Sequence, residues 1–234
     1  EQNESFFSEK ILKLPNCYQP TDNKRYFPNA TLSKKELGLP ENKFIFCSFN
    51  SPYKIQPEMF NVWMEILNSK EDSVLWLLEN EKSESINNLP AYARKKGIDP
   101  NRIIYSKRCE MNEYLGKLKV ADLFLDTFPI NAHTTASDAL WVGLPVLTLA
   151  GKSMVSRVAG SLLNNINMQD LITYNYDDYK NMALKLSNNK TYLNKIKHQL
   201  KKDRLTSSLF DTKQYTKNLE DIYSNLYTNF KNNF

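Results

Sequence analysis

Residues 131–138, with the sequence NAHTTASD, hold the side chains of this chain best suited to binding an anion. If a strand ends here and a helix begins, the first N–H groups of that helix have no partner, and together with the helix dipole they attract phosphate. The hydroxyls of Thr134 and Thr135 would add donors, and His133 directly precedes them. Two alternatives stand beside this: Thr134 only caps the helix, and His133 is merely packed or solvated.

Two other side chains could extend such a site. Asp138 lies one turn into the same predicted helix, where a carboxylate could accept hydrogen bonds from vicinal ribose hydroxyls; its alternative role is to complement the helix dipole. Lys54 follows the first predicted strand and could reach a diphosphate over the sheet edge, although a loop lysine is commonly just solvated. Asp122 and Asp126 form no Asp-x-Asp pair, so we predict no metal cluster.

The elements that must position these residues follow from alternating short apolar runs and amphipathic segments. We predict strands over residues 43–49, 73–78, 102–105, 122–126, 145–149 and 171–174. We predict helices from residue 57 and over residues 84–96, 110–118, 134–142 and 153–164. This spacing is typical of right-handed βαβ units around a parallel sheet with helices on both faces, a Rossmann-like α/β fold.

In such a sheet, ligands bind beyond the carboxyl ends of the strands, near a topological switch point. The turns to watch are therefore 50–54, 79–81, 106–110 and 127–135.

The ends of the chain look different from its middle. Residues 1–40 are an irregular lead-in, in which Ser33 and Glu36 predict a capping box for a short helix. Residues 41–175 form the predicted Rossmann-like domain, and residues 176–234 are helical. The last helix should be capped by Asp211, and its apolar stripe must lie against something; the stripe comprises Tyr215, Leu219, Ile222, Tyr223 and Leu226. The chain begins at Glu1 rather than Met, which suggests a piece of a longer protein.

Composition disfavours several other kinds of protein. The 234 residues are 41% apolar, but the longest apolar stretch, 139–150, is shorter than the roughly 18 residues of a spanning helix, so we predict no membrane association. The net charge of +5 is spread over the chain, and the basic run 195–204 lacks interleaved aromatics, so no nucleic-acid groove is expected.

Three scattered cysteines indicate neither a disulfide framework nor a zinc site and favour a reducing cytoplasm. The glycine fingerprints of dinucleotide sites and P-loops are missing from the sequence.

A family resemblance rests on many motifs in one order. They include YQPTDNKR (18–25), FCSFN (46–50), YKI (53–55), SVLWLL (73–78), NRII (101–104), LDT (125–127), HTT (133–135), SRVA (156–159) and FDTKQY (210–215). Together they resemble the carboxyl-terminal half of the catalytic region of protein O-linked N-acetylglucosamine transferases, their bacterial homologues and the related protein O-fucosyltransferases. The resemblance covers residues 14–227.

The resemblance implies a GT-B glycosyltransferase, in which two Rossmann-like lobes face each other across a cleft and tetratricopeptide repeats lie upstream. Residues 41–175 would be the nucleotide-sugar-binding domain of the second lobe. It implies inverting, metal-independent transfer to Ser or Thr hydroxyls of a protein or peptide, with no cofactor besides the donor, UDP-N-acetylglucosamine or GDP-fucose. The general base and much of the acceptor groove would lie in the amino-terminal lobe, so we expect this piece to be inactive alone.

The resemblance also implies roles for particular residues. Lys54 matches the catalytic lysine that stabilises the departing diphosphate, the segment 133–135 matches the one that wraps the phosphates, and Asp138 matches the ribose-binding carboxylate. The full predicted nucleotide-sugar site is Ser51, Lys54, Cys109, Met111, Tyr114, Lys117, His133, Thr134, Thr135 and Asp138.

Four of these residues depart from the pattern of the N-acetylglucosamine transferases. Ser51 replaces a glutamine, Met111 a lysine, Tyr114 a histidine and Lys117 an arginine. Tyr114 could still stack on a uracil, whereas Met111 offers no charged donor. These changes leave the sugar and base open. Met111 and Ser51 lend some support to a different class of function, a non-catalytic nucleotide-binding or protein-interaction module.

Overall fold

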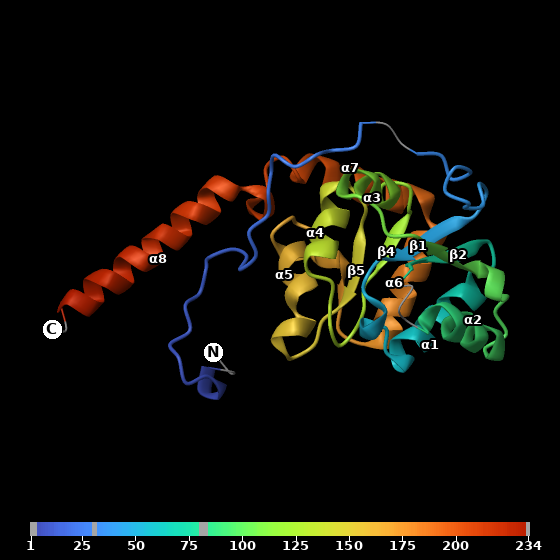
Figure 1. The fold of residues 1–234 in the computed structure, drawn as a ribbon, viewed down its shortest axis with the longest axis horizontal. Helices are drawn as coiled ribbons and strands as arrows, with labels where there is room; N and C mark the ends of the chain where they lie inside the picture. Colours follow the sequence, from blue (N-terminus) through green and yellow to red (C-terminus); the bar gives the residue numbers. More distant parts are fainter. Residues whose placement is uncertain (1–3, 30–31, 80–83, 233–234) are drawn as a thin grey trace.

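The computed structural model describes residues 4–29, 32–79 and 84–232. Its centre is a six-stranded sheet in the order β3-β2-β1-β4-β5-β6, and every neighbouring pair is parallel (Figure 1). The strands are β1 (Phe44–Ser48), β2 (Ser73–Leu78), β3 (Ile103–Ser106), β4 (Leu123–Leu125), β5 (Val146–Leu149) and β6 (Ile172–Thr173). The predicted Rossmann-like α/β fold is therefore confirmed.

Helices cover both faces of this sheet. The described α-helices are α1 (Pro57–Ser69), α2 (Ser85–Lys95), α3 (Met111–Leu118), α4 (Thr134–Trp141), α5 (Val158–Asn164), α6 (Tyr176–Asn188), α7 (Lys190–Asp203) and α8 (Thr212–Asn232). Figure 1 shows α3 and α4 on one side of the strands and α1, α2 and α6 on the other. Consistently, α3 packs against α4, α4 against α5, and α1 against α6.

The strand order creates one topological switch point. The chain winds outward from β1 to β3, then returns to the other side of β1 as β4 and winds outward again to β6. Connections leave β1 and β4 in opposite directions, so a crevice opens between their carboxyl ends. The turn after β2 falls mostly on residues outside the described ranges, whereas the turns after β1, β3 and β4 are described.

Local sequence explains the main elements. The central strands β1 and β2 are buried along almost their whole length, as their continuous apolar runs predict. Pro57 begins α1, where its missing N–H costs nothing. Gly143 follows the end of α4 with φ +84°, a conformation that only glycine adopts without strain, and lets Leu144 N–H return to Ala139 O (2.9 Å).

Two predicted helices are wrong in detail. The segment 153–164 is split into a 3₁₀ turn (Met154–Ser156) and α5, because the carbonyl of Val155 accepts a hydrogen bond from Asn131 N–H (2.9 Å) instead of continuing the helix. Ser33 and Glu36 do form the predicted capping box, with Ser33 N–H to Glu36 Oε2 at 2.8 Å and Glu36 N–H to Ser33 Oγ at 3.2 Å. It closes only a hydrogen-bonded turn, however, rather than a helix.

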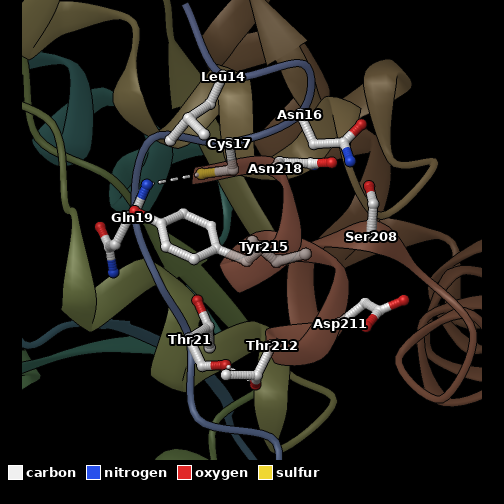
Figure 2. A pocket seen from close by; sticks show the side chains of 11 residues that line it. Leu14, Asn16, Cys17, Gln19, Thr21, Ser208, Asp211, Thr212, Tyr215 and Asn218 are labelled. Atoms are coloured by element: carbon white, nitrogen blue, oxygen red, sulfur yellow. Dashed lines mark hydrogen bonds between the residues drawn. The ribbon is translucent and has the colours of Figure 1, made fainter. Parts of the chain in front are cut away.

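Along the chain, the lead-in first faces the start of α8 and then crosses the α3–α4 layer. Figure 2 shows the first of these places, where Thr212 Oγ1 donates to Thr21 O (2.8 Å). Tyr215 Oη also donates to Tyr18 O (3.1 Å). The cap predicted at Asp211 is present, with Gln214 N–H at 2.9 Å from its Oδ1.

The long helix α8 then extends away from the body of the molecule (Figure 1). It has no buried residue along its described length, although Ile222 and Leu226 of its predicted stripe share a cavity wall with Ile11 and Leu12 of the lead-in. Of the described helices, none is long and apolar enough to cross a membrane.

Candidate functional site

A cavity of about 450 Å³ lies at the carboxyl ends of the strands, over the switch point. It is built from the turns after β1 and β3, from the end of β2, and from the amino-terminal halves of α3 and α4. Eight of the ten predicted site residues line it, namely Ser51, Lys54, Cys109, Met111, Tyr114, Thr134, Thr135 and Asp138. The structure therefore brings together residues that are up to 87 positions apart in the sequence (from Ser51 to Asp138).

Lys54 spans the crevice between β1 and β4. It ends a 3₁₀ turn (Pro52–Lys54) that follows β1, and its Nζ donates to the carbonyl of Asn131, in the turn after β4 (2.9 Å). Partial burial lowers the pKa of Lys54, and the nearby carboxyl of Asp126 opposes that shift. A half-buried cation at this place could interact strongly with an anion in the cavity, because its charge is only partly screened by water.

The turn after β4 is held by Asp126, whose side chain is fully buried. Its Oδ1 accepts from the N–H groups of Thr127 (2.8 Å) and Ala132 (2.6 Å), and its Oδ2 accepts from Thr148 Oγ1 (2.7 Å). Asn50, from the turn after β1, donates to Thr127 Oγ1 (2.9 Å) and so ties the two turns together. Burial raises the pKa of Asp126 to about 7, and the surrounding donors oppose that shift.

The first turn of α4 faces the cavity. His133 occupies the N-cap position and Thr134 is the first helical residue, so the interpretation of Thr134 as the cap is wrong. The helical ladder starts with Ser137 N–H to His133 O (3.1 Å), so the N–H groups of Thr134, Thr135 and Ala136 precede it. Thr134 and Thr135 also line the cavity.

Asp138 lies at the inner wall of the cavity, 4% exposed. Its Oδ1 accepts from Nη1 of Arg25 (2.5 Å), and the hydroxyl of Tyr114 lies near the same carboxylate. Burial raises the pKa of Asp138, and the charge of Arg25 opposes that rise. Tyr114 packs against Phe49 with ring centroids 6.1 Å apart.

Two predicted site residues stand apart from the cavity lining. His133 points its Nδ1 toward Tyr18 Oη (3.3 Å), and its pKa is lowered by burial and by the charge of Lys54. Lys117 is buried beside the site, where its Nζ pairs with Glu113 (2.9 Å) and donates to Lys107 O (3.2 Å).

Sequence reasoning missed the residues that shape this site from behind. Asn50, Asp126 and Arg25 all lay inside the motifs quoted above or at a predicted strand end, but their roles depend on partners 76 to 113 positions away. Among these three residues, only Asp126 could have been recognised from the sequence, because a carboxylate at the end of an apolar strand needs buried hydrogen-bond donors.

Taken together, a sheet with this strand order and a cavity at its switch point define a Rossmann-like lobe of the kind found in GT-B glycosyltransferases. The sequence profile of glycosyl transferase family 41 matches residues 17–219. The chain belongs to that family, and the resemblance seen in its motifs is confirmed.

Named relatives agree with this. The chain is 38% identical over 223 residues to the probable UDP-N-acetylglucosamine--peptide N-acetylglucosaminyltransferase SEC of Arabidopsis thaliana, a match that covers 93% of the chain and 23% of the relative. It is 32% identical to the corresponding Caenorhabditis elegans transferase, covering 87% of the chain and 18% of the relative. A solved mutant of the Thermobaculum terrenum O-GlcNAc transferase superposes with a TM-score of 0.86 at 25% identity, over 95% of this chain and 42% of that one. The chain thus spans about a quarter or less of the curated relatives' length.

Proposed function

We propose that this chain is the donor-binding lobe of an inverting protein O-glycosyltransferase. In this proposal, the lobe holds a nucleotide sugar, and N-acetylglucosamine passes from UDP to a Ser or Thr hydroxyl of a protein. The relatives named above are transferases that use UDP-N-acetylglucosamine, which supports this donor over GDP-fucose.

One observation carries the proposal: Lys54 and the first turn of α4 come from opposite sides of the switch point and meet at one cavity. A cation and a set of backbone N–H groups that precede a helical ladder form a suitable cradle for a diphosphate. Asp138, deeper in the same cavity, would accept from the ribose hydroxyls, and Thr134 and Thr135 would donate to the phosphates.

The chemistry asked of this lobe is mainly electrostatic. The acceptor oxygen attacks the anomeric carbon, the bond from that carbon to the diphosphate oxygen breaks, and its electron pair stays on the diphosphate. The proton of the acceptor hydroxyl goes to a base, which we place in the amino-terminal lobe. Lys54 and the N–H groups of α4 would stabilise the charge that develops on the leaving diphosphate, and this lobe alone would catalyse no transfer.

The base of the nucleotide would lie toward α3, where Cys109, Met111 and Tyr114 line the cavity. Met111 is more than half exposed there and offers an apolar contact. Tyr114 packs against Phe49, and its hydroxyl lies near Asp138 and Thr135. Lys117, paired with Glu113, would support this wall from outside.

The proposal is tested by titrating the chain with UDP and with GDP while following tryptophan fluorescence. Trp76 is a suitable reporter because its ring centroid lies 4.8 Å from that of Phe49, and Phe49 lines the cavity. We expect saturable binding of UDP, its loss in Lys54→Ala, and its retention in Lys197→Ala, a lysine at the opposite edge of the sheet. Preference for GDP would overturn the assigned donor, and binding of neither would overturn the function.

A further inference from the structure

Arg25 is a buried arginine from the lead-in that reaches into the back of the site. Its side chain is 16% exposed. Nη1 donates to Asp138 Oδ1 (2.5 Å) and Nη2 donates to the carbonyl of Ser137 (3.0 Å). The guanidinium is therefore fixed to two consecutive residues of α4 through two different nitrogens.

Two aromatic rings lie against the same guanidinium. Its central carbon lies 5.1 Å from the ring centroid of Trp141, in the last turn of α4, and 5.8 Å from that of Phe210, just before α8. Stacking of this kind restricts a guanidinium to one orientation and compensates part of the cost of its burial. Burial lowers the pKa of Arg25, and the charge of Asp138 opposes that shift.

The Asp138 carboxylate can still accept hydrogen bonds on the side that faces the cavity. A carboxylate offers about four acceptor positions on its two oxygens. Arg25 takes Oδ1 from behind, while the residue as a whole lines the cavity. An ion pair with one defined oxygen holds the plane of the carboxylate and leaves acceptor positions for a ligand.

We propose that Arg25 is a positioning residue that orients the Asp138 carboxylate for the ribose hydroxyls of the donor nucleotide. The inference rests on the proposed function, since it assumes that a nucleotide occupies this cavity. It makes the lead-in and the segment before α8 part of the donor site, because they supply Arg25 and Phe210.

The test compares ligands with and without a ribose diol. In Arg25→Met, we expect affinity for UDP to fall by about ten- to a hundredfold, the range for losing a hydrogen bond to a charged group. Affinity for pyrophosphate, which has no ribose, should stay within about twofold of wild type, because Lys54 and α4 are unchanged. Affinity for 2′,3′-dideoxy-UDP should likewise stay unchanged, and Arg25→Lys should restore part of the UDP affinity.

Arg204 offers a matched control. Its guanidinium lies 5.2 Å from the ring centroid of Trp141, and Nη1 donates to the carbonyl of that residue (2.9 Å), so it too is an arginine bound to α4 by stacking and one backbone contact. Arg204→Met should therefore reproduce any general loosening of α4 without touching Asp138. We expect it to leave the preference for UDP over 2′,3′-dideoxy-UDP unchanged.

The outcomes separate cleanly. Equal losses for UDP and pyrophosphate in Arg25→Met, no loss for either, or the same ribose-specific loss in Arg204→Met would each overturn the positioning role. If Arg25→Met does not fold, the Arg25→Lys variant provides the test. An affinity for UDP equal to that of wild type in Arg25→Lys would overturn the positioning role of Arg25. Failure of the wild-type chain to bind UDP or GDP would instead refute the proposed function. The Asp138→Asn variant tests the ribose assignment independently, because it should lower the affinity for UDP whether or not Arg25 has a positioning role.

Discussion

An aspartate flanks β4 at each end, and the two side chains lie in opposite surroundings. We call the side of the sheet where the amino ends of the strands lie the amino edge, and the side where their carboxyl ends lie the carboxyl edge. At the amino edge, Asp122 is about a quarter exposed, accepts from Ile45 N–H (2.9 Å) and pairs with Lys197 (3.4 Å) and Lys34 (3.8 Å). At the carboxyl edge, Asp126 is fully buried and is surrounded by neutral donors.

This difference bears on where an anionic ligand could bind. The ion pairs at the amino edge join α7 and the lead-in to the start of the strands. The neutral network around Asp126 instead shapes the turn between β4 and α4, and Lys54 nearby is paired with a carbonyl rather than with a carboxylate. A cation that is not neutralised by a carboxylate can still bind an anionic ligand.

The largest expected effect is on transfer. In the full-length protein, Lys54→Ala should lower the rate of sugar transfer to a peptide by about 10²–10³, the usual consequence of removing one electrostatic contact to a leaving group. Lys197→Ala, which removes an equal charge at the amino edge, should leave the rate unchanged. Equal effects of the two substitutions would abolish the functional distinction between the edges.

Asp126 should make stability depend on pH. Burial raises its pKa in the folded state to about 7, above the value near 3.9 of an unfolded chain, so between these values the folded state holds a proton that the unfolded state has lost. The free energy of unfolding contributed by this group is therefore highest below about pH 4 and falls as pH rises to about 7. From pH 5 to pH 8, wild type should lose about 3 kcal/mol relative to Asp126→Asn, measured by urea unfolding. Parallel pH profiles for the two proteins would contradict this.

Tyr114 should have a smaller effect, because only its hydroxyl lies near Asp138 and Thr135. Tyr114→Phe keeps the ring against Phe49 and should cost about 1 kcal/mol in the free energy of unfolding, with a several-fold loss of UDP affinity. A loss of stability without any change in UDP affinity would place the hydroxyl outside the site.

The smallest effect belongs to the amino edge. Lys34→Ala and Lys197→Ala should each change the free energy of unfolding by less than about 1 kcal/mol, because both ion pairs are partly exposed. Raising the salt concentration should reduce that difference further. A loss of several kcal/mol in either variant would show that the amino edge depends on these pairs more than their exposure suggests.

The sequence predicted the sheet well because strand and helix periodicity are local properties. The run 44–48 and the helix face from Met59 to Leu67 could be recognised without knowledge of their neighbours. The 3₁₀ turn before α5 could not, because it depends on Asn131 N–H taking the carbonyl of Val155 from a distant turn.

The site divides in the same way. Thr134, Thr135 and Lys54 could be predicted because their places follow from where strands end, a rule that needs only the fold class. Arg25 could not be predicted, because nothing near it in the sequence indicates that it reaches Asp138, 113 positions later. The division of the chain at residues 40 and 175 stays a prediction.

The central claim is that a diphosphate binds where β4 turns into α4, beside Lys54. The most direct test is titration of the isotope-labelled chain with UDP while recording backbone amide chemical shifts. The account predicts that the largest changes fall on the amides of Thr134, Thr135 and Ala136, and that pyrophosphate alone reproduces them. Largest changes at the amino edge around Ile45, or unchanged amides in the first turn of α4 at saturating UDP, would contradict it.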